Sequence, residues 1–589
     1  MTARIKIILL LLLILILTAV SRLYGLDWDQ GSGLHPDERF LTMVTADISL
    51  PDSLAGYLDT SSSPANPHNR GYGFYVYGTF PVVFVKWLAV SLNLDSYTGI
   101  MHLGRRVSAL LDIGLVLLIF LITRRIFSAG RPALLGAFFY VASVLPIQLA
   151  HFYAVDTFMV FFLVLGFYFL IHLYFSRSLF LKSLLSIFLG LSFGLAVASK
   201  ISALLFAPVI ALGFLVYAVH TRHLPRLLLL LFAVTISGYF SLRLAQPYLF
   251  ADSRLVTLRP NPKVISNWRD LNRMSTADAS FPPAVQWLHV PKISYSLGNL
   301  TLWGLGLPLA IVAFFSFIPA VFHLRRHPLL ILPLVWVSGL FLYQSVQFAQ
   351  PIRYFYPIYP FLGIISGFGF SHFLSRFRHP GLILALTLTL ALIWPVSFLS
   401  IYSRPHSRVS ASRWINQNVP HGSTLSCEHW DDCLPIGNTP GIAIIEFPLY
   451  GQDSQAKWQD MSRRLDQTDY IILSSNRLYG SIMTAPERYP ITTRYYQLLF
   501  SGALGFSKVA EFTSRPNLPF PGIHLCLTPP FIKYGSVAFS SQQCPLSGVS
   551  FVDDYADETF TVYDHPKVLI FQNTARLSPP EIFNKISSF

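Results

Sequence analysis

The sequence predicts a mainly α-helical, polytopic membrane protein of about eleven spans with a C-terminal α/β domain. Three observations lead to this prediction. Hydrophobic residues make up 53% of the 589 positions and charged residues only 12%, whereas soluble domains carry about 25% charged residues. The mean hydropathy of +0.51 excludes a disordered chain. Near residue 402, long apolar runs give way to a mixed composition.

The first apolar run covers residues 5–20, with Arg4 and Lys6 at its start. A signal peptide has a similar apolar core, but no small-residue cleavage site follows in good context. We therefore predict a retained first span. Its basic end stays inside, so that the next segment emerges outside.

Residues 21–103 then form a long first external loop. Within it, residues 73–92 are aromatic and apolar, but Pro81 and Lys86 interrupt them. A full span here would invert the topology of everything that follows. We therefore predict a helix that lies along the membrane surface.

Ten further apolar segments have spanning length. They lie near residues 105–123, 132–150, 156–175, 183–199, 201–219, 227–245, 302–322, 329–347, 354–373 and 381–401. The predicted cytoplasmic turns carry basic residues and no Asp or Glu: Arg124, Arg125, Arg131, Arg177, Lys182, Arg222, Arg226, Arg325, Arg326, Arg376 and Arg378. This positive-inside pattern accounts for nearly all of the net charge of +14. Nucleic acid is therefore not a predicted partner.

An odd number of spans places the C-terminus outside. We predict a membrane domain over residues 1–402, which includes the external loop 21–103, and an extracytoplasmic α/β domain over residues 403–589. In the second domain we predict helices at 403–418 and 457–466 and a buried strand at 470–474. Residues 559–564 and 568–572 read as two strands of a hairpin.

All four cysteines fall in this outer domain: Cys427, Cys433, Cys526 and Cys544. The most local pairing joins Cys427 to Cys433 and Cys526 to Cys544, but sequence alone leaves three connectivities open. A zinc site is less favoured because the chain has no CxxC spacing.

The first candidate for chemistry is the adjacent acid pair Asp37 and Glu38, within the segment LHPDERF. Adjacent acids in a polar loop are usually solvated. Here they follow His35 and Pro36, precede Arg39, and lie close to a membrane surface. A carboxylate at such a site is able to act as a general base.

Three further ionisable residues lie at predicted outer ends of spans. Asp156 begins the fourth span, where it is either an N-cap or a second functional acid. Lys200 divides a long apolar run and marks an external turn, either as a snorkelling side chain or as a cation for a lipid phosphate. Arg353 precedes Tyr354 in an aromatic segment, either as part of an interfacial belt or as a phosphate ligand.

Weaker candidates for the same surface are His102, Arg105 and Arg106, which come just before the second span. The segment 246–300 is rich in Pro, Trp and basic residues, and is predicted to cover the site or to meet acidic lipids. We find no Walker loop, GxGxxG, HExxH or GxSxG motif, so nucleotide-dependent and hydrolase functions are not supported.

The order and sidedness of these residues resemble the multi-spanning, lipid-carrier-dependent glycosyltransferases of the C-type fold. The early Asp-Glu pair, Asp156, Lys200 and the segment RYFYPIYP from Arg353 carry the resemblance, which covers about residues 1–400. The nearest group is that of the protein O-mannosyltransferases and the lipid A aminoarabinose transferases. The outer domain does not look like the soluble domains of the better-known members.

The resemblance implies an inverting enzyme that moves a sugar from a polyprenyl-phosphate or dolichyl-phosphate donor to an acceptor hydroxyl outside the membrane. It implies that Asp37 is the base, with Glu38 and Asp156 as further catalytic acids. The implied phosphate ligands are Lys200, Arg353 and Arg105; the implied substrate contacts are His35, Arg39, His151 and Tyr354.

The acceptor is left open between a protein, a lipid and a glycan, and the other partners are membrane lipids. No metal site is predicted: a divalent metal is possible but not indicated, because cationic side chains fill its role. The main alternative is a transporter or lipid-linked sugar flippase, which would place charged groups at the bilayer midplane. A catalytically inactive scaffold is a third alternative.

Overall fold

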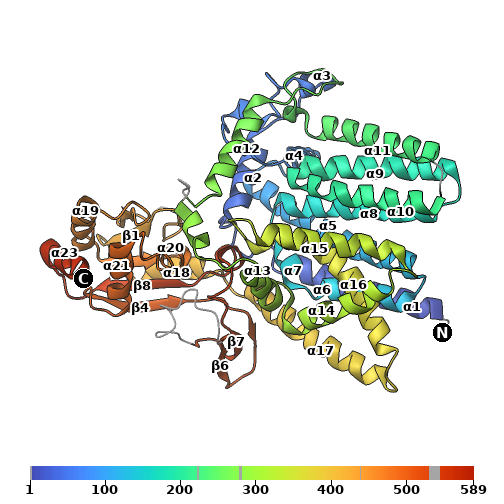
Figure 1. Ribbon diagram of the computed structural model, residues 1–589. Helices are drawn as coiled ribbons and strands as arrows, with labels where there is room; N and C mark the ends of the chain where they lie inside the picture. Colours follow the sequence, from blue (N-terminus) through green and yellow to red (C-terminus); the bar gives the residue numbers. More distant parts are fainter. Residues whose placement is uncertain (1–2, 222–223, 278–281, 438, 530–543, 589) are drawn as a thin grey trace.

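The computed structural model describes residues 3–221, 224–277, 282–437, 439–529 and 544–588. The helices of the first 400 residues form one bundle, and the strands gather in a separate lobe at one end of it (Figure 1). Arg222, which was predicted to lie in a cytoplasmic turn, falls outside the described residues.

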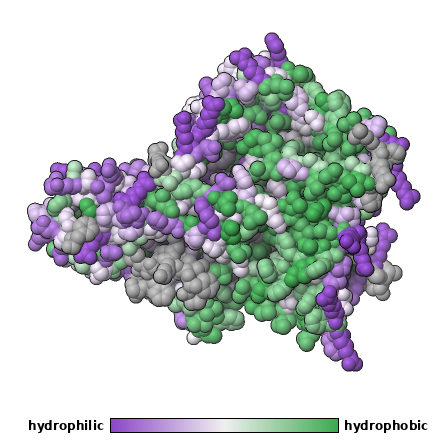
Figure 2. All heavy atoms as spheres, viewed as in Figure 1, coloured by the Kyte–Doolittle hydropathy of each residue, from purple (hydrophilic) through white to green (hydrophobic). Residues whose placement is uncertain are grey.

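Within the described residues, nine helices are long and apolar enough to cross a membrane, or up to eleven if two bent pairs each count as one span. The bundle consists of α1 (Ala3–Leu23), α5 (Tyr97–Phe127), α6 (Gly130–Val141), α7 (Val144–Ala150), α8 (Val155–Phe175), α9 (Leu179–Ser199), η2 (Ile201–Phe206), α10 (Ala207–Thr221), α11 (Leu224–Ala245), α13 (Ser294–Asn299), η5 (Leu300–Leu305), α14 (Leu307–Phe322), η6 (Pro328–Leu330), α15 (Ile331–Ser345), η7 (Ile352–Ile358), α16 (Tyr359–Leu374) and α17 (Pro380–Leu399). On the face shown in Figure 2, apolar side chains cover most of the middle of this bundle, whereas the lobe with the strands is largely hydrophilic. The fold class predicted from the sequence is confirmed, and the chain is a multi-pass membrane protein.

Two pairs of helices are bent, and one of the bends has a local cause. Helices α6 and α7 meet at 62°, and the α13–η5 segment meets α14 at 118°. The second bend is made at Gly306, whose φ is +80°. A Cβ atom there would lie 2.7 Å from the Trp394 ring, so only glycine fits without strain. Pro308 then starts α14 in the first helical turn, where its missing N–H is not needed.

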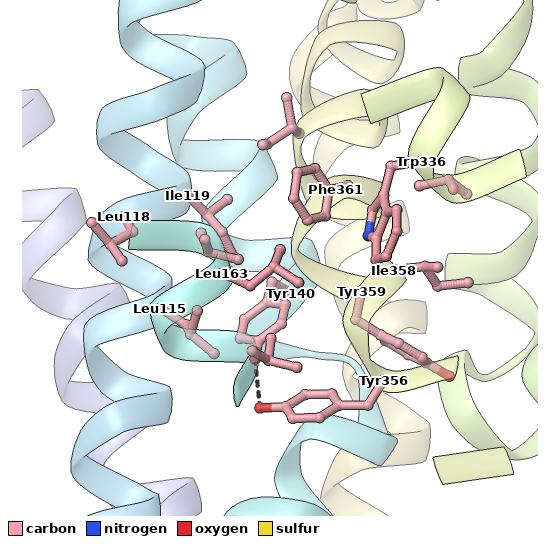
Figure 3. Close-up of a cluster of buried hydrophobic side chains, with 14 of the residues drawn as sticks. Leu115, Leu118, Ile119, Tyr140, Leu163, Trp336, Tyr356, Ile358, Tyr359 and Phe361 are labelled. Atoms are coloured by element: carbon pink, nitrogen blue, oxygen red, sulfur yellow. Dashed lines mark hydrogen bonds between the residues drawn. The ribbon is translucent and has the colours of Figure 1, made fainter. Parts of the chain in front are cut away.

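Tyr140 and Tyr356 lie among the apolar side chains of the bundle core, and a hydrogen bond joins their hydroxyls (Figure 3). The two hydroxyls belong to a buried polar cluster. Arg22 of α1 donates to Asp112 of α5 at 2.8 Å, and both side chains are fully buried. Asp112 also accepts from the hydroxyls of Tyr140 and Tyr356. Arg22 therefore ties the end of α1 to the interior of the bundle. Through Tyr356, the cluster fixes η7, the turn that carries Arg353.

The segments between spans carry shorter helices: α2 (Pro36–Asp47), α3 (Leu54–Leu58), η1 (Pro67–Arg70), α4 (Phe80–Ser91), η3 (Pro247–Leu249), α12 (Pro262–Met274) and η4 (Pro282–Trp287). Helix α4 is the apolar helix expected within 73–92, and its twelve residues are too few for a span. Its placement along the membrane surface stays a prediction.

The remaining elements are η8 (Ser400–Ser403), α18 (Ser407–Asn418), β1 (Thr424–Glu428), β2 (Ala443–Phe447), α19 (Gln455–Asp466), β3 (Tyr470–Leu473), α20 (Arg477–Ile482), α21 (Pro490–Phe500), β4 (Phe506–Phe512), β5 (Asn517–Leu518), β6 (His524–Leu527), β7 (Gly548–Phe551), α22 (Glu558–Thr561), β8 (Val568–Asn573) and α23 (Pro579–Ser587). A mixed sheet has the order β2-β1-β3-β8-β4, and a smaller one the order β5-β7-β6. Successive residues of β3 point to opposite faces: Ile471 packs with α19, α21 and α23, and Ile472 with α18. The predicted helices and the buried strand are present, while the domain boundary at 402 stays a prediction.

The predicted hairpin of 559–564 with 568–572 is wrong. The second strand exists as β8, but it pairs with β3 and β4. The first segment begins with the helical turn α22, because the Asp557 carboxylate accepts from the Thr559 N–H at 3.0 Å and caps the turn. This turn also docks on the bundle, where Gln148 of α7 donates to the Phe560 carbonyl at 2.7 Å.

The cysteines pair as Cys427–Cys433 and Cys526–Cys544, so the most local of the three possible connectivities is the one observed.

Candidate active site

A cavity of about 660 Å³ opens where the ends of several bundle helices meet the C-terminal lobe. Its walls come from α2, α8, η2, α12, η4, α15, η7 and the lobe. One part is apolar and is lined by Met159, Leu163, Leu205, Trp336 and Leu340. The other part contains the ionisable side chains, so the cavity has an apolar end within the bundle and a polar end beneath the lobe.

Asp37 reaches the cavity from the first turn of α2. His35 caps this helix by accepting from the Glu38 N–H at 3.2 Å, and Pro36 occupies the first turn, where proline is tolerated. The positive end of the helix dipole favours a carboxylate in this turn. The Asp37 side chain is 25% exposed and pairs with the Arg353 guanidinium.

The charge state of Asp37 follows from its neighbours. Burial alone would raise the pKa of this carboxyl, but the Arg353 guanidinium and a hydrogen bond from the Tyr77 hydroxyl outweigh burial. The pKa of Asp37 is therefore held well below its usual value. Asp37 is ionised at neutral pH, and while it is paired with Arg353 it is a weak base.

Asp156 and Lys200 form a second ion pair on the cavity wall. The Lys200 ammonium lies 2.7 Å from Asp156 Oδ1, and the two side chains are 23% and 9% exposed. Asp156 lies in the first turn of α8 and is not its N-cap, which is Ala154. Lys200 ends α9 and precedes η2, as expected for the turn between two spans.

Tyr354 brings the two cations together. The Lys200 ammonium lies 5.0 Å from the centre of its ring, and the Arg353 guanidinium carbon lies 5.8 Å from it. Arg353 Nε is buried and has no hydrogen-bond partner among the described residues. A buried donor without a partner is costly, so a rotation of the guanidinium that gives this atom an anionic partner would be favourable.

Glu38 and Arg105 were predicted as a catalytic acid and a phosphate ligand, but neither lines the cavity. Both side chains are fully buried and lie 2.7 Å apart. Arg105 also contacts Asp29 at 2.9 Å, and Glu38 accepts from the Tyr153 N–H at 2.8 Å. These contacts provide hydrogen-bond partners for both side chains, and the pair connects α2 to α5. We therefore do not carry the chemical roles of Glu38 and Arg105 forward.

Three predicted substrate contacts also lie outside the cavity lining. His35 is 1% exposed, between the rings of Phe152 and Tyr563. His151 is fully buried and stacks on Tyr402 at 3.9 Å. Arg39 donates to the Gly33 carbonyl at 2.8 Å and to Asp432 of the lobe at 2.8 Å. These residues position α2 and the lobe, and Tyr354 is the predicted substrate contact that lines the cavity.

Sequence reasoning missed several wall residues: Tyr77, Trp268, Gln286, Trp287, Trp430, Arg477, Glu558 and Tyr563. Four of them come from the lobe. No local pattern distinguishes them, since they meet the cavity only through tertiary packing. The segment 246–300 was expected to cover the site or to meet acidic lipids, and α12 and η4 place it over the cavity.

No three His, Cys, Asp or Glu side chains gather as metal ligands within the described ranges. Asp37 and Asp156 each already have a cationic side chain as partner. This donor set fits an anionic ligand beside two cations better than it fits a divalent metal.

Comparisons with known proteins support a family resemblance. A family model described as dolichyl-phosphate-mannose-protein mannosyltransferase matches residues 84–242. No curated protein matches the chain by sequence.

Solved structures share the fold at low identity. The oligosaccharyltransferase of Archaeoglobus fulgidus, tethered with an acceptor peptide containing the NVT sequon, has a TM-score of 0.53 at 13% identity over 97% of this chain and 89% of that chain. The oligosaccharyltransferase AglB of the same organism, in complex with an inhibitory peptide and a dolichol-phosphate, has a TM-score of 0.51 at 13% identity over 96% and 88%. ArnT from Cupriavidus metallidurans, bound to undecaprenyl phosphate, has a TM-score of 0.45 at 12% identity over 82% and 95%. The family-model match over residues 84–242 and the shared fold of the two structures with TM-scores above 0.5 confirm the predicted resemblance to glycosyltransferases of the C-type fold.

Proposed function

We propose that this chain is an inverting glycosyltransferase that moves a sugar from a polyprenyl-phosphate donor to an acceptor hydroxyl on the outer face of the membrane. One observation carries the proposal. The Lys200 ammonium and the Arg353 guanidinium carbon lie 5.0 Å and 5.8 Å from the centre of the Tyr354 ring. Arg353 Nε has no hydrogen-bond partner among the described residues, and the Asp37 carboxylate is paired with the same guanidinium. Two fixed cations beside a carboxylate suit a phosphate leaving group and a base.

The shape of the cavity fits a lipid-linked donor. Its apolar end, between α8 and α15, suits the first part of a polyprenyl chain, and the cations at its polar end suit the phosphate. The same division explains why no nucleotide-binding motif is needed. We assign Lys200 and Arg353 to the phosphate, with Tyr354 beneath it.

The proposed transfer is a single displacement at the anomeric carbon of the donor sugar. The acceptor oxygen attacks the anomeric carbon from the face opposite the phosphate, and the bond between that carbon and the phosphate oxygen breaks. The bonding electrons leave with the phosphate, where the two cations stabilise the charge. The acceptor proton passes to Asp37, and the configuration at the anomeric carbon inverts.

Donor binding also activates the base in this scheme. In the described structure Arg353 neutralises Asp37, which lowers the proton affinity of the carboxylate. When Arg353 turns its charge toward the donor phosphate, Asp37 loses part of this stabilisation and its proton affinity rises. The carboxylate thus becomes a stronger base only when a donor is present.

We assign the cavity to the outer side of the membrane from the distribution of basic residues. The basic residues Arg124, Arg125, Arg177 and Lys182 lie at the ends of α5, α8 and α9 that are opposite the cavity. By the positive-inside rule these ends face the cytoplasm. The cavity and the C-terminal lobe then lie outside, where disulfides persist.

The test uses the full chain in liposomes with a panel of polyprenyl-phosphate sugars. Mass spectrometry measures the release of polyprenyl phosphate, and NMR determines the anomeric configuration of the product. We expect wild type to turn over at least one donor with inversion, and Asp37→Asn to lower turnover by about 10²–10⁴-fold. Exposed Asp52→Asn is the matched control. Equal turnover by wild type and Asp37→Asn would rule out the assigned base.

A further inference from the structure

We propose that the end of the cavity beneath the C-terminal lobe is the acceptor subsite, and that it takes an uncharged saccharide. The inference rests on the proposed glycosyl transfer and names its acceptor class. The subsite consists of Trp268, Gln286, Trp287, Trp430, Arg477 and Glu558, all of which line the cavity. Tyr563 connects it to the donor end, since the Arg353 guanidinium carbon lies 5.9 Å from the centre of the Tyr563 ring.

Three tryptophans from separate segments line the cavity. Trp268 belongs to α12 and Trp287 to η4, whereas Trp430 belongs to the loop after β1. The Trp268 indole N–H donates to the Val76 carbonyl at 3.4 Å, and Trp430 is 42% exposed. One face of a sugar ring carries mainly C–H groups, so a flat indole is able to bury it while the hydroxyls point outward.

Planar polar groups stand beside these rings. Glu558 pairs with Arg477 through one carboxylate oxygen and accepts from the Gln286 amide through the other. Arg477 also donates to the Trp430 carbonyl at 2.8 Å. Carboxylate, guanidinium and amide groups held in one connected array present the donors and acceptors that neighbouring sugar hydroxyls require.

The charges in this wall balance. Glu558 is compensated by Arg477. Farther along the same loop, Asp431 is paired with Arg408, and Asp432 with Arg408 and Arg39. A charged acceptor would therefore find no excess of opposite charge here to compensate for its lost hydration. An uncharged sugar does not need such compensation. This balance favours an uncharged sugar over a phosphorylated one.

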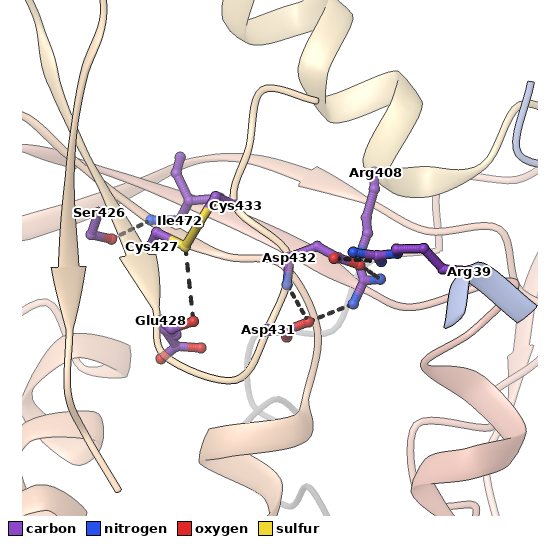
Figure 4. Close-up of a disulfide and its surroundings, with 9 residues drawn as sticks. All are labelled: Arg39, Arg408, Ser426, Cys427, Glu428, Asp431, Asp432, Cys433 and Ile472. Atoms are coloured by element: carbon purple, nitrogen blue, oxygen red, sulfur yellow. Dashed lines mark hydrogen bonds and ion pairs between the residues drawn. A yellow bond between two sulfur atoms is a disulfide. The ribbon is translucent and has the colours of Figure 1, made fainter. Parts of the chain in front are cut away.

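The loop that carries Trp430 is held rigid (Figure 4). The Cys427–Cys433 disulfide closes it across six residues. Buried Arg408 binds both Asp431 and Asp432 at 2.6 Å, and Arg39 of α2 binds Asp432 at 2.8 Å. The backbone of Trp430 is thus held in place relative to the helix that holds Asp37, as a platform for a rigid acceptor requires.

A peptide acceptor fits this wall less well. Extended peptides bind through backbone hydrogen bonds, often to the edge of a sheet. None of the described residues that line the cavity lies in a β-strand. The Trp430 carbonyl, a backbone acceptor of this wall, already receives a hydrogen bond from Arg477. The wall offers side-chain groups and ring faces, which are the means of sugar recognition.

The test measures binding and turnover with the full chain in nanodiscs. Saturation-transfer NMR compares three probes with undecaprenyl phosphate present: a methyl hexoside or its disaccharide, the same sugar as a phosphate ester, and a hexapeptide with Ser and Thr. We expect contact with the neutral glycoside only. Contact with the peptide or the sugar phosphate, and none with the glycoside, would overturn the proposal.

Variants locate the contact. We expect Trp430→Ala to raise the KM for the glycoside about tenfold, with kcat nearly unchanged and undecaprenyl phosphate affinity retained. We expect Trp430→Phe to have a smaller increase in this KM than Trp430→Ala. The double variant with Cys427→Ser and Cys433→Ser should raise the KM as Trp430→Ala does. Trp87→Ala is the matched control, since Trp87 is 53% exposed on α4 and does not line the cavity. An unchanged KM in Trp430→Ala would refute the subsite.

The NMR experiment separates this inference from the proposed function. If no donor is turned over but the glycoside contacts wild type and not Trp430→Ala, the transfer reaction fails and the saccharide subsite stands. If a donor is turned over and only the peptide accepts the sugar, the transferase stands and the subsite fails.

Discussion

Asp37 and Glu38 are neighbours in the first turn of α2, yet they lie in opposite environments. Successive residues of an α-helix are rotated by about 100°, which turns Asp37 toward the cavity and Glu38 into the protein. Asp37 is 25% exposed and pairs with Arg353, whereas Glu38 and its partner Arg105 are fully buried. Arg353 therefore has space to exchange its carboxylate for a ligand, and Arg105 does not.

The same contrast divides the other ion pairs. Asp156–Lys200 and Glu558–Arg477 line the cavity, as Asp37–Arg353 does, and we call these three the open pairs. Glu38–Arg105 and Asp112–Arg22 are sealed pairs, with no exposed side-chain surface. Substitutions in open pairs should alter substrate binding and chemistry, and those in sealed pairs should alter stability.

The largest effect is expected at the sealed pair Glu38–Arg105, where substitution should lower stability. Glu38→Gln leaves buried Arg105 with one carboxylate partner, Asp29, and should destabilise the protein by about 3 kcal/mol. Thermal unfolding in detergent measures the effect. Glu487→Gln is the control, since Glu487 is 59% exposed in its pair with His289 and should change stability by less than about 0.5 kcal/mol. Equal stability of wild type and Glu38→Gln would contradict the distinction between open and sealed pairs.

A smaller effect is expected at an open pair. Lys200→Gln removes one cation from the proposed phosphate site, so the Kd for undecaprenyl phosphate should rise about tenfold because one charge-assisted hydrogen bond is lost. The melting temperature without ligand should change little. Binding in nanodiscs measures the Kd, and Lys263→Gln on α12 is the control. If Lys200→Gln only lowered stability, its pair would belong with the sealed ones.

The smallest effect concerns pH. The Tyr77 hydroxyl helps to lower the pKa of Asp37. In Tyr77→Phe the pKa of Asp37 should therefore rise, and the acidic limb of the kcat/KM profile should move to higher pH because protonation of the base abolishes transfer. Tyr72→Phe, which removes a similar hydrogen bond to Asp47 away from the cavity, should leave the profile unchanged. A shift to lower pH would contradict the assignment of Asp37 as the base.

Much of the fold could be predicted, because apolar runs of spanning length and basic turns are local signals. Asp156, Lys200 and Arg353, which line the cavity, were singled out for the same reason: a charge at the end of a span is unusual wherever the chain then folds. Asp37 was singled out by the adjacent acid pair in the first external loop. Glu38 was assigned a chemical role because adjacency in sequence does not reveal which side of a helix turn faces a cavity.

The residues that the lobe contributes to the cavity wall carry no such local signal in the sequence. Trp430, Arg477 and Glu558 are ordinary residues in a domain of ordinary composition, and they reach the cavity only because the lobe docks on the bundle. The predicted strand at 559–564 failed for a related reason. The Asp557 cap and the contact of Phe560 with Gln148 decide its conformation.

The order in which the walls are synthesised has a consequence for biogenesis. Glu558 and Tyr563 are translated only after every apolar segment of the bundle, and the loop of Trp430 is complete only after Cys427 and Cys433 have been oxidised. A ribosome-bound bundle would hold Asp37 and Arg353 but lack the wall beneath the lobe. On the proposed function, the acceptor subsite would thus be completed only after the whole chain has been synthesised and the Cys427–Cys433 disulfide has formed.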